Sequence, residues 1–327
     1  MIKSTLFDQL DQAVTAILAR PEEAIAAVAE IEPLARIARE LRGLPREDFK
    51  ARLKANLEKE TAMTTAVETT TKTPTAEHYQ TLMPYIMHDR VPELAEFVKQ
   101  VFGAEELTRA IGSAGGFHIE VRIGNATLML GGGGKAKIEK PTPTSLHLYV
   151  PDADAVYRKA IAAGATSLYE PVEQGYGDRE AGITDVAGNQ WFIATHRGAS
   201  YIPEGVRTVT PGMRVKGADK AIEFLQRAFG AEDAGTYRSP EGVVFHAKFR
   251  IGDSMIELGE AHGQWQPMPS AFYLLVNDAD SAYQQALQAG ATSTSAPADQ
   301  PYGHRMGGVI DPFGNQWFVA GPISEKR

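Results

Sequence analysis

The sequence contains no cysteine among its 327 residues, and this absence excludes several kinds of chemistry. Disulfide bonds, thiolate nucleophiles, iron–sulfur clusters and cysteine-type zinc sites all require cysteine side chains. Any catalysis must therefore depend on His, carboxylate, Tyr, Lys, Ser or Thr side chains, or on a metal held by nitrogen and oxygen ligands.

Long hydrophobic runs are also lacking. No stretch approaches the ~20 apolar residues of a membrane-spanning helix, and Asp8, Gln9 and Asp11 interrupt the region where a signal peptide would be apolar. We therefore expect a cytoplasmic protein that does not associate with membranes. Basic residues number 33 against 41 acidic residues, and the formal charge of −8 argues against a nucleic-acid partner.

The N-terminal part of the chain has the spacing of short amphipathic helices. Phe49, Leu53 and Leu57, for example, recur at intervals of one helical turn. Residues 1–60 are predicted to form a small α-helical segment that packs on itself, on the rest of the chain, or on a second copy in a homodimer. The Thr-rich residues 61–77 are interpreted as a linker, with a strand as the alternative.

The remaining chain is a tandem repeat of about 127 residues. The offset between matching segments stays between 126 and 128, which indicates two duplicated units, residues 78–198 and 199–327. The matching pairs include residues 101–105 with 228–232, Phe117-His118 with Phe245-His246, Arg122-Ile-Gly124 with Arg250-Ile-Gly252, and residues 188–192 with 314–318.

Each unit repeats the same order of local signals. A strand leads into a helix, closed by Gly103 or Gly230, and strands with alternating apolar and polar residues follow. Asp152 and Asp278 are placed to cap a second helix. A type I turn signature, residues 185–188 or 311–314, closes the unit with a hairpin. The order β-α-β-β-β is therefore predicted twice in each unit, and Trp191 and Trp317 are predicted to face the helices as core residues.

These motifs resemble the vicinal oxygen chelate superfamily, which includes glyoxalase I, extradiol dioxygenases, fosfomycin resistance enzymes and bleomycin resistance proteins. The similarity is carried by FGAE, V-x-D-A-D, AGA and D-P-F-G-N-x-W, and the PhnB-like branch is the most similar. The resemblance implies an α+β fold of tandem vicinal oxygen chelate units. In each unit, paired βαβββ modules would form a curled mixed sheet with helices on its convex face and substrate on its concave face.

The resemblance also implies four metal-ligand positions per unit, on the first, fourth, fifth and eighth strands. Only Glu257 among them is a good ligand, whereas a catalytic metal needs about three protein ligands. We therefore expect no cofactor, with a divalent metal at Glu257 as the alternative. The positions are Leu82, Met129, Ser145 and Phe192 in the first unit, and Thr210, Glu257, Ala271 and Phe318 in the second.

The concave faces carry further polar and aromatic side chains. Glu257 and His246 are candidate catalytic residues, although Arg214 could form an ion pair with Glu257 instead. His118 and His147 with Glu120 could form a metal site of two His and one carboxylate, or act as separate hydrogen-bonding groups. The candidate ligand-binding residues are His118, Glu120, Arg122, Ser145, His147, Tyr149, Tyr176, Gln190, Phe192, Arg214, Lys248, Arg250, Tyr273, Tyr302, Arg305, Gln316 and Phe318.

Three functions remain open from the sequence. The first is a metal-free protein of the bleomycin resistance type that binds a small, anionic molecule, with Tyr176 and Tyr302 as lids and Arg179 and Arg305 beside them. The second is a lyase, isomerase or dioxygenase that acts in the second unit through Glu257, His246 and Tyr273. The third makes residues 1–60 a dimerising or partner-binding module.

Overall fold

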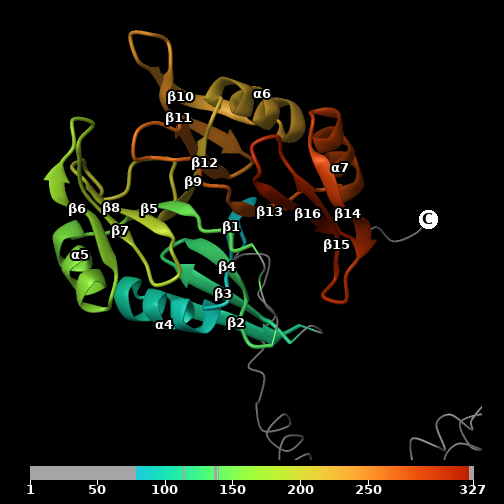
Figure 1. Ribbon diagram of the computed structural model, residues 1–327, viewed down its shortest axis with the longest axis horizontal. Coiled ribbons are helices and arrows are strands. Elements are labelled where there is room, and N and C mark those ends of the chain that lie inside the picture. Colours follow the sequence, from blue (N-terminus) through green and yellow to red (C-terminus); the bar gives the residue numbers. More distant parts are fainter. Residues whose placement is uncertain (1–78, 113–114, 136–137, 139, 324–327) are drawn as a thin grey trace, which may run out of the picture. The chain divides into compact units, whose positions relative to one another are not determined.

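The computed structural model describes residues 79–112, 115–135, 138 and 140–323 (Figure 1). All of these residues, and therefore both repeat units, belong to one compact part of the chain. The predicted helical segment 1–60 and linker 61–77 lie outside the described residues. Within the part that is described, no helix combines the length and the apolar character that crossing a membrane would demand.

Four βαβββ modules follow one another along the chain. The first unit contains β1 (Leu82–Met87), α4 (Val91–Phe102), β2 (Glu105–Ile111), β3 (Phe117–Ile123), β4 (Ala126–Gly132), β5 (Ser145–Tyr149), α5 (Ala153–Ala162), β6 (Thr166–Glu173), β7 (Asp178–Thr184) and β8 (Gln190–His196). The second contains β9 (Val209–Val215), α6 (Ala218–Phe229), β10 (Glu232–Arg238), β11 (Val244–Ile251), β12 (Ser254–Glu260), β13 (Ala271–Leu275), α7 (Ala279–Gln288), β14 (Thr292–Asp299), β15 (His304–Ile310) and β16 (Gln316–Pro322).

The modules form two eight-stranded mixed sheets, and each sheet contains strands from both units. Sheet I has the order β14-β15-β16-β13-β1-β4-β3-β2, and sheet II has the order β10-β11-β12-β9-β5-β8-β7-β6. Antiparallel pairs β1–β13 and β5–β9 join the modules, whereas each module pairs its own first and last strands in parallel. Each sheet therefore combines one module of the first unit with one of the second.

In contrast to the sheets, each hydrophobic core beneath the helices is formed almost entirely by residues of one unit. One core lies under α4 and α5 and contains Trp191, and the other lies under α6 and α7 and contains Trp317. Both tryptophans are fully buried, which confirms that they are core residues. Two residues cross over, because Leu82 of the first unit joins the second core and Val209 of the second unit joins the first. The opposite side of each sheet is called its helix-free face below.

Local capping explains where several helices begin and end. Asp152 accepts a hydrogen bond from the Ala155 backbone N–H, and Asp278 accepts one from Ser281, as their positions predict. Gly103 and Gly230 close α4 and α6 with φ values of +68° and +65°, a conformation that favours glycine. These contacts confirm the local order that the repeat predicts.

The hairpin signature at the end of each unit has a structural role. Asp185 lies in the turn before β8, where its carboxylate accepts hydrogen bonds from the backbone N–H of Ala187 and Asn189. The same carboxylate also accepts a bond from the Trp191 indole at 2.8 Å. Asp311 repeats this arrangement, with Trp317 at 3.0 Å. The recurring Asp, Asn and Trp thus tie the turn to the core.

Candidate functional site

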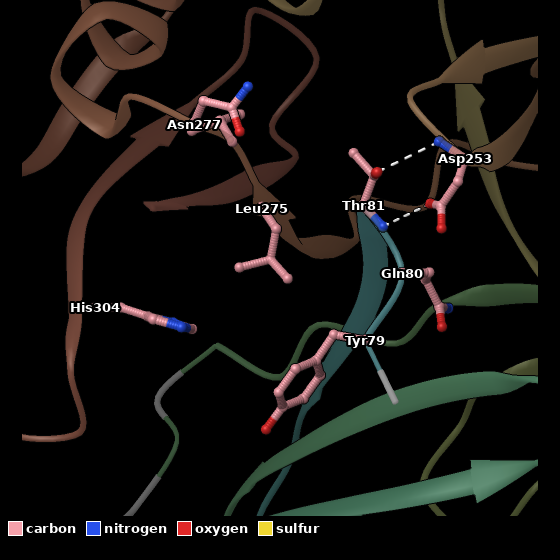
Figure 2. Close-up of a pocket in the computed structure, with 8 residues that line it drawn as sticks. Tyr79, Gln80, Thr81, Asp253, Leu275, Asn277 and His304 are labelled. Atoms are coloured by element: carbon pink, nitrogen blue, oxygen red, sulfur yellow. Dashed lines mark hydrogen bonds between the residues drawn. The ribbon is translucent and has the colours of Figure 1, made fainter. Parts of the chain in front are cut away.

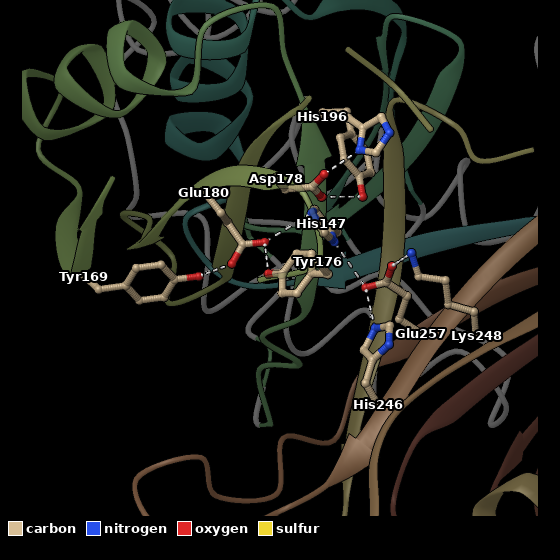
Figure 3. Close-up of polar contacts among 10 residues, drawn as sticks. His147, Tyr169, Tyr176, Asp178, Glu180, His196, His246, Lys248 and Glu257 are labelled. Atoms are coloured by element: carbon tan, nitrogen blue, oxygen red, sulfur yellow. Dashed lines mark hydrogen bonds and ion pairs between the residues drawn. The ribbon is translucent and has the colours of Figure 1, made fainter. Parts of the chain in front are cut away.

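Because sheet II combines strands of both units, charged side chains cluster on its helix-free face (Figure 3). His147 on β5 lies between two carboxylates: its Nδ1 is 3.3 Å from Glu257 on β12, and its Nε2 is 3.3 Å from Glu180 on β7. On β11, His246 Nε2 and Lys248 Nζ lie 3.6 and 3.4 Å from the Glu257 carboxylate. Side chains from both units therefore meet at Glu257.

Electrostatics favour the charged forms of the central pair. Burial by itself would raise the pKa of Glu257, but His147 and then His246 outweigh burial and hold that pKa well below its usual range. Burial would likewise lower the pKa of His147, but Glu257 and Glu180 outweigh it and raise that pKa. We therefore assign a carboxylate to Glu257 and an imidazolium to His147.

Tyrosines surround the cluster as hydrogen-bond donors. Tyr169 and Tyr176 both donate to the Glu180 carboxylate, the latter at 3.0 Å, and Tyr149 donates to Asp178 at 3.1 Å. Burial is the main cause that raises the pKa of each of these three tyrosines, and nearby carboxylates raise it further. The phenols consequently keep their protons and serve as donors. Asp178 also lies 2.6 Å from His196, whose ring adds a further polar group to this network.

Three buried polar atoms of this face lack a hydrogen-bond partner among the described residues: His147 Nε2, Thr210 Oγ1 and Glu257 Oε1. The ion pairs of His147 with Glu180 and of Glu257 with Lys248 bring opposite charges close, but these two atoms are not in hydrogen-bonding geometry. Thr210 on β9 is the register partner of His147 on β5. The three groups come from three adjacent strands, β5, β9 and β12.

The helix-free face of sheet I has a different chemistry. Tyr79 donates to Glu120 at 2.9 Å, and His118 lies 3.1 Å from the same carboxylate. Tyr85 contacts His118 at 3.3 Å, and burial raises the pKa of Tyr85 to about 12. Tyr273 contacts His304 at 2.8 Å. The neighbouring apolar side chains on this face are Met83, Met129, Met306 and Phe318.

A cavity of about 440 Å³ lies beside this second cluster. Figure 2 shows Tyr79 and His304 on its two sides, with Leu275 between them and Thr81 hydrogen-bonded to Asp253. It is lined by residues 79–81, just before β1 of the first unit, and by Leu275 on β13 and His304 on β15 of the second unit. This site is therefore also shared between the units.

The arrangement of strands in the two sheets shows that two predicted groups of site residues are wrong. His118 and Glu120 lie on β3 of sheet I, whereas His147 lies on β5 of sheet II, so these residues do not form a site of two His and one carboxylate. Arg214 does not neutralise Glu257, because it donates to Gln190 at 2.9 Å and lies over the Trp265 ring. His147 and Lys248 are the basic partners of Glu257 instead.

The first strand of the first unit also differs from the expected register. Leu82 is buried in the core beneath the helices, and Met83 takes the position that Thr210 holds in the second unit. A shift by one residue reverses the face of every side chain in a strand. The two first strands match at Pro84 and Pro211, an offset of 127, whereas the prediction used 128 at this point.

The predicted lid residues separate into different roles. Tyr176 joins the sheet II cluster through Glu180, whereas Tyr302 donates to the Met306 sulfur at 3.3 Å. Arg305 pairs with Asp280 and Asp299, and Arg179 in the other unit pairs with Asp154. These arginines link strands to helices rather than pointing at a ligand.

The remaining predicted residues fall on both sheets. Arg122 on β3 pairs with Glu105 on β2, and Arg250 lies on β11, opposite Glu232 in register. Tyr149 stacks on His147 with ring centres 4.5 Å apart. The other predicted ligand-binding residues are Ser145, Gln190 and Phe192 on sheet II, and Tyr273, Gln316 and Phe318 on sheet I.

Several residues of the two clusters are missing from the sequence predictions. Asp178 and Glu180 alternate along β7 and lie on the same side as the cluster. The period-two spacing of acidic residues in a strand next to β8 was the signal that could have identified them. Tyr79, Tyr85 and His304 carry no comparable signal, because their partners come from distant segments.

The residues at the four implied metal positions do not fit a catalytic metal on either sheet. Sheet II places Ser145, Phe192, Thr210 and Glu257 there, and sheet I places Met83, Met129, Ala271 and Phe318. Across the part of the chain that is described, no three His, Asp or Glu side chains are arranged to hold a metal ion. Pairing a module of one unit with a module of the other therefore still gives no set of metal ligands of the glyoxalase I type.

Comparison with known proteins places this fold in a family. The family model described as the Glyoxalase/Bleomycin resistance protein/Dioxygenase superfamily matches residues 207–319. An uncharacterized protein of Mycobacterium bovis is 34% identical over 128 residues, covering 36% of this chain and 84% of that protein. CFP32 of the same bacterium, provisionally named a glyoxylase, is 26% identical over 197 residues, covering 57% of this chain and 72% of that protein.

Solved structures agree with this assignment at the level of the fold. Glyoxalase I from Zea mays superposes with a TM-score of 0.56 at 12% identity, covering 73% of this chain and 92% of that chain. A Bacillus subtilis protein provisionally described as a dioxygenase gives a TM-score of 0.50 at 13% identity, covering 74% and 85%. The chain belongs to the glyoxalase/bleomycin resistance/dioxygenase superfamily, which confirms the predicted resemblance at that level.

Proposed function

We propose that the protein binds a small, neutral, polar molecule on the helix-free face of sheet II. The observation that carries this proposal is the set of three buried polar atoms without a hydrogen-bond partner, on His147, Thr210 and Glu257. Leaving such a group unpaired costs about 1–3 kcal/mol. A ligand with both donor and acceptor groups, such as hydroxyls or amides, would relieve these costs on three adjacent strands at once.

The charges of the cluster favour a neutral ligand over a charged one. His147 and Lys248 carry positive charge, Glu180 and Glu257 are carboxylates, and the ion pairs join them within 3.3–3.4 Å. A charged ligand would have to compete with these pairs after losing its own hydration. Hydrogen bonds to the Thr210 hydroxyl and to the Glu257 Oε1 lone pairs require no such exchange.

We further propose that binding on this face needs no metal, because only Glu257 among the four implied positions is a ligand of the usual kind. Added Mn²⁺, Ni²⁺ or Zn²⁺ is expected to leave the melting temperature within about 1 °C, since a tightly bound native-state ligand must stabilise the fold. Thermal melting with each ion, together with elemental analysis of protein purified without chelator, makes the measurement. A stoichiometric divalent ion that is released only by chelation would overturn the metal-free proposal.

Replacement of Thr210 by Val tests the binding site itself. Valine keeps the shape of threonine but removes the unpartnered hydroxyl, so the free protein should melt at the same or a higher temperature. Ligands are to be sought by thermal shift in a collection of neutral hydroxyl- and amide-bearing compounds. For a compound that stabilises the wild type, Thr210→Val should weaken binding about tenfold, equal to ~1.4 kcal/mol.

The matched control is Thr166→Val, which removes a hydroxyl from an exposed position on β6 of the same sheet. Binding to this variant should equal that of the wild type. If Thr210→Val bound every identified compound as tightly as the control, the helix-free face of sheet II would not be the binding site.

An enzymatic role is the second candidate, and the His147–Glu257 pair is the observation that favours it. The low pKa of Glu257 argues against this carboxylate as a general base near neutral pH, because an effective base has a pKa close to the working pH. The raised pKa of His147 makes it the better candidate for proton transfer, as an acid. His147→Gln tests the catalytic role, since the glutamine amide can still donate a hydrogen bond but cannot act as an acid, so turnover of a substrate should be abolished while binding is only weakened.

A further inference from the structure

A second pocket is lined partly by Gln190 and Arg214 of sheet II. It has a volume of about 700 Å³, within the usual range of small-molecule sites, and none of His147, Thr210 or Glu257 lines it. Its walls include four prolines, Met268 and Ile310, and its polar groups include the amides of Gln190 and Gln316. The charged side chains among its lining residues are Arg214 and Lys140, so the pocket carries positive charge and no carboxylate.

Arg214 is the unusual group in this pocket. It is half-buried on β9, yet it forms no ion pair with any carboxylate of the described residues. Its guanidinium donates one hydrogen bond to the Gln190 amide oxygen and lies 4.8 Å from the centre of the Trp265 ring. Burial lowers the pKa of Arg214, which indicates that its charge is held at a cost. A guanidinium has five N–H donors in a planar fork, so most of them remain available for another acceptor.

The repeat shows that this charge is specific to one half of the chain. Met87 of the first unit corresponds to Arg214, since both residues bridge to the segment that precedes the next strand, at Thr142 and Met268 respectively. The fold therefore accepts an apolar side chain at this position. An arginine without a carboxylate partner, at a position where methionine suffices in the other unit, points to a ligand for the charge rather than to a requirement of folding.

We propose that this pocket binds an organic carboxylate with an apolar body, the carboxylate on the Arg214 fork and the body against the prolines, Met268 and Ile310. The planar fork of arginine matches the two oxygens of a carboxylate, and such paired bonds are the strong ones. The Gln190 and Gln316 amides offer further hydrogen bonds at the same pocket. This site goes beyond the neutral-ligand site of sheet II, and neither depends on the other.

Intrinsic tryptophan fluorescence of the full chain provides the test. The chain has three tryptophans, and Trp191 and Trp317 are fully buried, so Trp265 beside Arg214 is the one positioned to report on the pocket. Cyclohexanecarboxylate is the probe, and cyclohexanecarboxamide is its neutral analogue. We expect a saturable change in emission with the carboxylate, at an affinity at least tenfold above that of the amide.

Three variants connect this signal to Arg214. Arg214→Met, which adopts the residue of the other unit, should weaken carboxylate binding at least tenfold without lowering the melting temperature. Arg214→Lys should give an intermediate loss, because it keeps the charge but not the fork. Arg305→Met removes an arginine that already has carboxylate partners and should bind as the wild type does.

Four outcomes would overturn the proposal: no saturable change, equal binding of the acid and the amide, unchanged binding in Arg214→Met and Arg214→Lys, or stronger competition by inorganic phosphate than by the carboxylate. Thr210→Val distinguishes the two sites. It should leave the carboxylate signal unchanged, so a failure of the neutral-ligand site would not remove this pocket.

Discussion

Replacement of Glu257 by Gln is expected to lower the free energy of unfolding by about 3 kcal/mol near pH 6, because it leaves buried positive charge without its main partner. The side chains of Glu257 and His147 are only 13% and 10% exposed, so solvent screens the pair weakly. Glu180 remains beside His147 in the variant, which keeps the loss at the lower end of the range for a broken buried pair. Urea denaturation of both proteins measures the difference.

The pH dependence of this difference identifies the ion pair as its cause. The pKa of Glu257 is depressed in the folded state, so its contribution is present above its unfolded pKa and is lost as pH falls through the folded value. The pKa of His147 is raised, so its contribution is present below its unfolded pKa and is lost as pH rises through the folded value. The difference should be largest between the two unfolded values, roughly pH 4.3 to 6.5.

Glu105→Gln serves as the control. Glu105 is 62% exposed and pairs with Arg122 on the surface of sheet I, so its loss should cost no more than about 1 kcal/mol. Equal stability of Glu257→Gln and the wild type across this pH window would contradict the assignment of a charged pair.

Replacement of Asp185 by Ala is expected to cost about 3 kcal/mol of stability for a different reason. The carboxylate is only 6% exposed and accepts bonds from Ala187, Asn189 and Trp191, and the variant leaves these buried donors unpaired. Burial raises the pKa of Asp185, which limits the net gain from its hydrogen bonds. Thermal and urea unfolding monitored by tryptophan fluorescence measures the loss.

Asp152→Ala is the matched comparison, because Asp152 is exposed and its side chain caps a helix through one bond to Ala155. A lost N-cap costs about 1 kcal/mol. A loss for Asp185→Ala no larger than that for Asp152→Ala would show that Asp185 stabilises the turn no more than a helix cap stabilises its helix.

Much of the local structure follows from the sequence alone. The repeat, the caps at Asp152 and Asp278, the glycine helix ends and the core tryptophans each depend on residues a few positions apart. Alternation along β3 separates Ile119 and Val121 from His118 and Glu120 in the same way. Such patterns can be predicted because their energetics are set within one turn of helix or one strand.

The composition of each site depends instead on which strands meet. The β5–β9 pairing places His147 near Glu257, 110 residues further along the chain, and the β1–β13 pairing leaves His118 and Glu120 on the other sheet. Arg214 likewise acquires its partners from distant segments, Gln190 from β8 and Trp265 from the loop between β12 and β13. The modules have similar edge strands, so the sequence alone does not predict which module pairs with which.

The sequence by itself thus determined the family, the order of βαβββ modules, and the local caps, turns and core positions. Only the tertiary structure decided that each module pairs with a module of the other unit. That pairing makes one helix-free face a charged cluster of His147, Glu180 and Glu257 and the other a face of tyrosines and methionines. The physical reason is that sheet pairing selects among edges far apart in the chain, whereas the signals readable in a sequence act over a few residues.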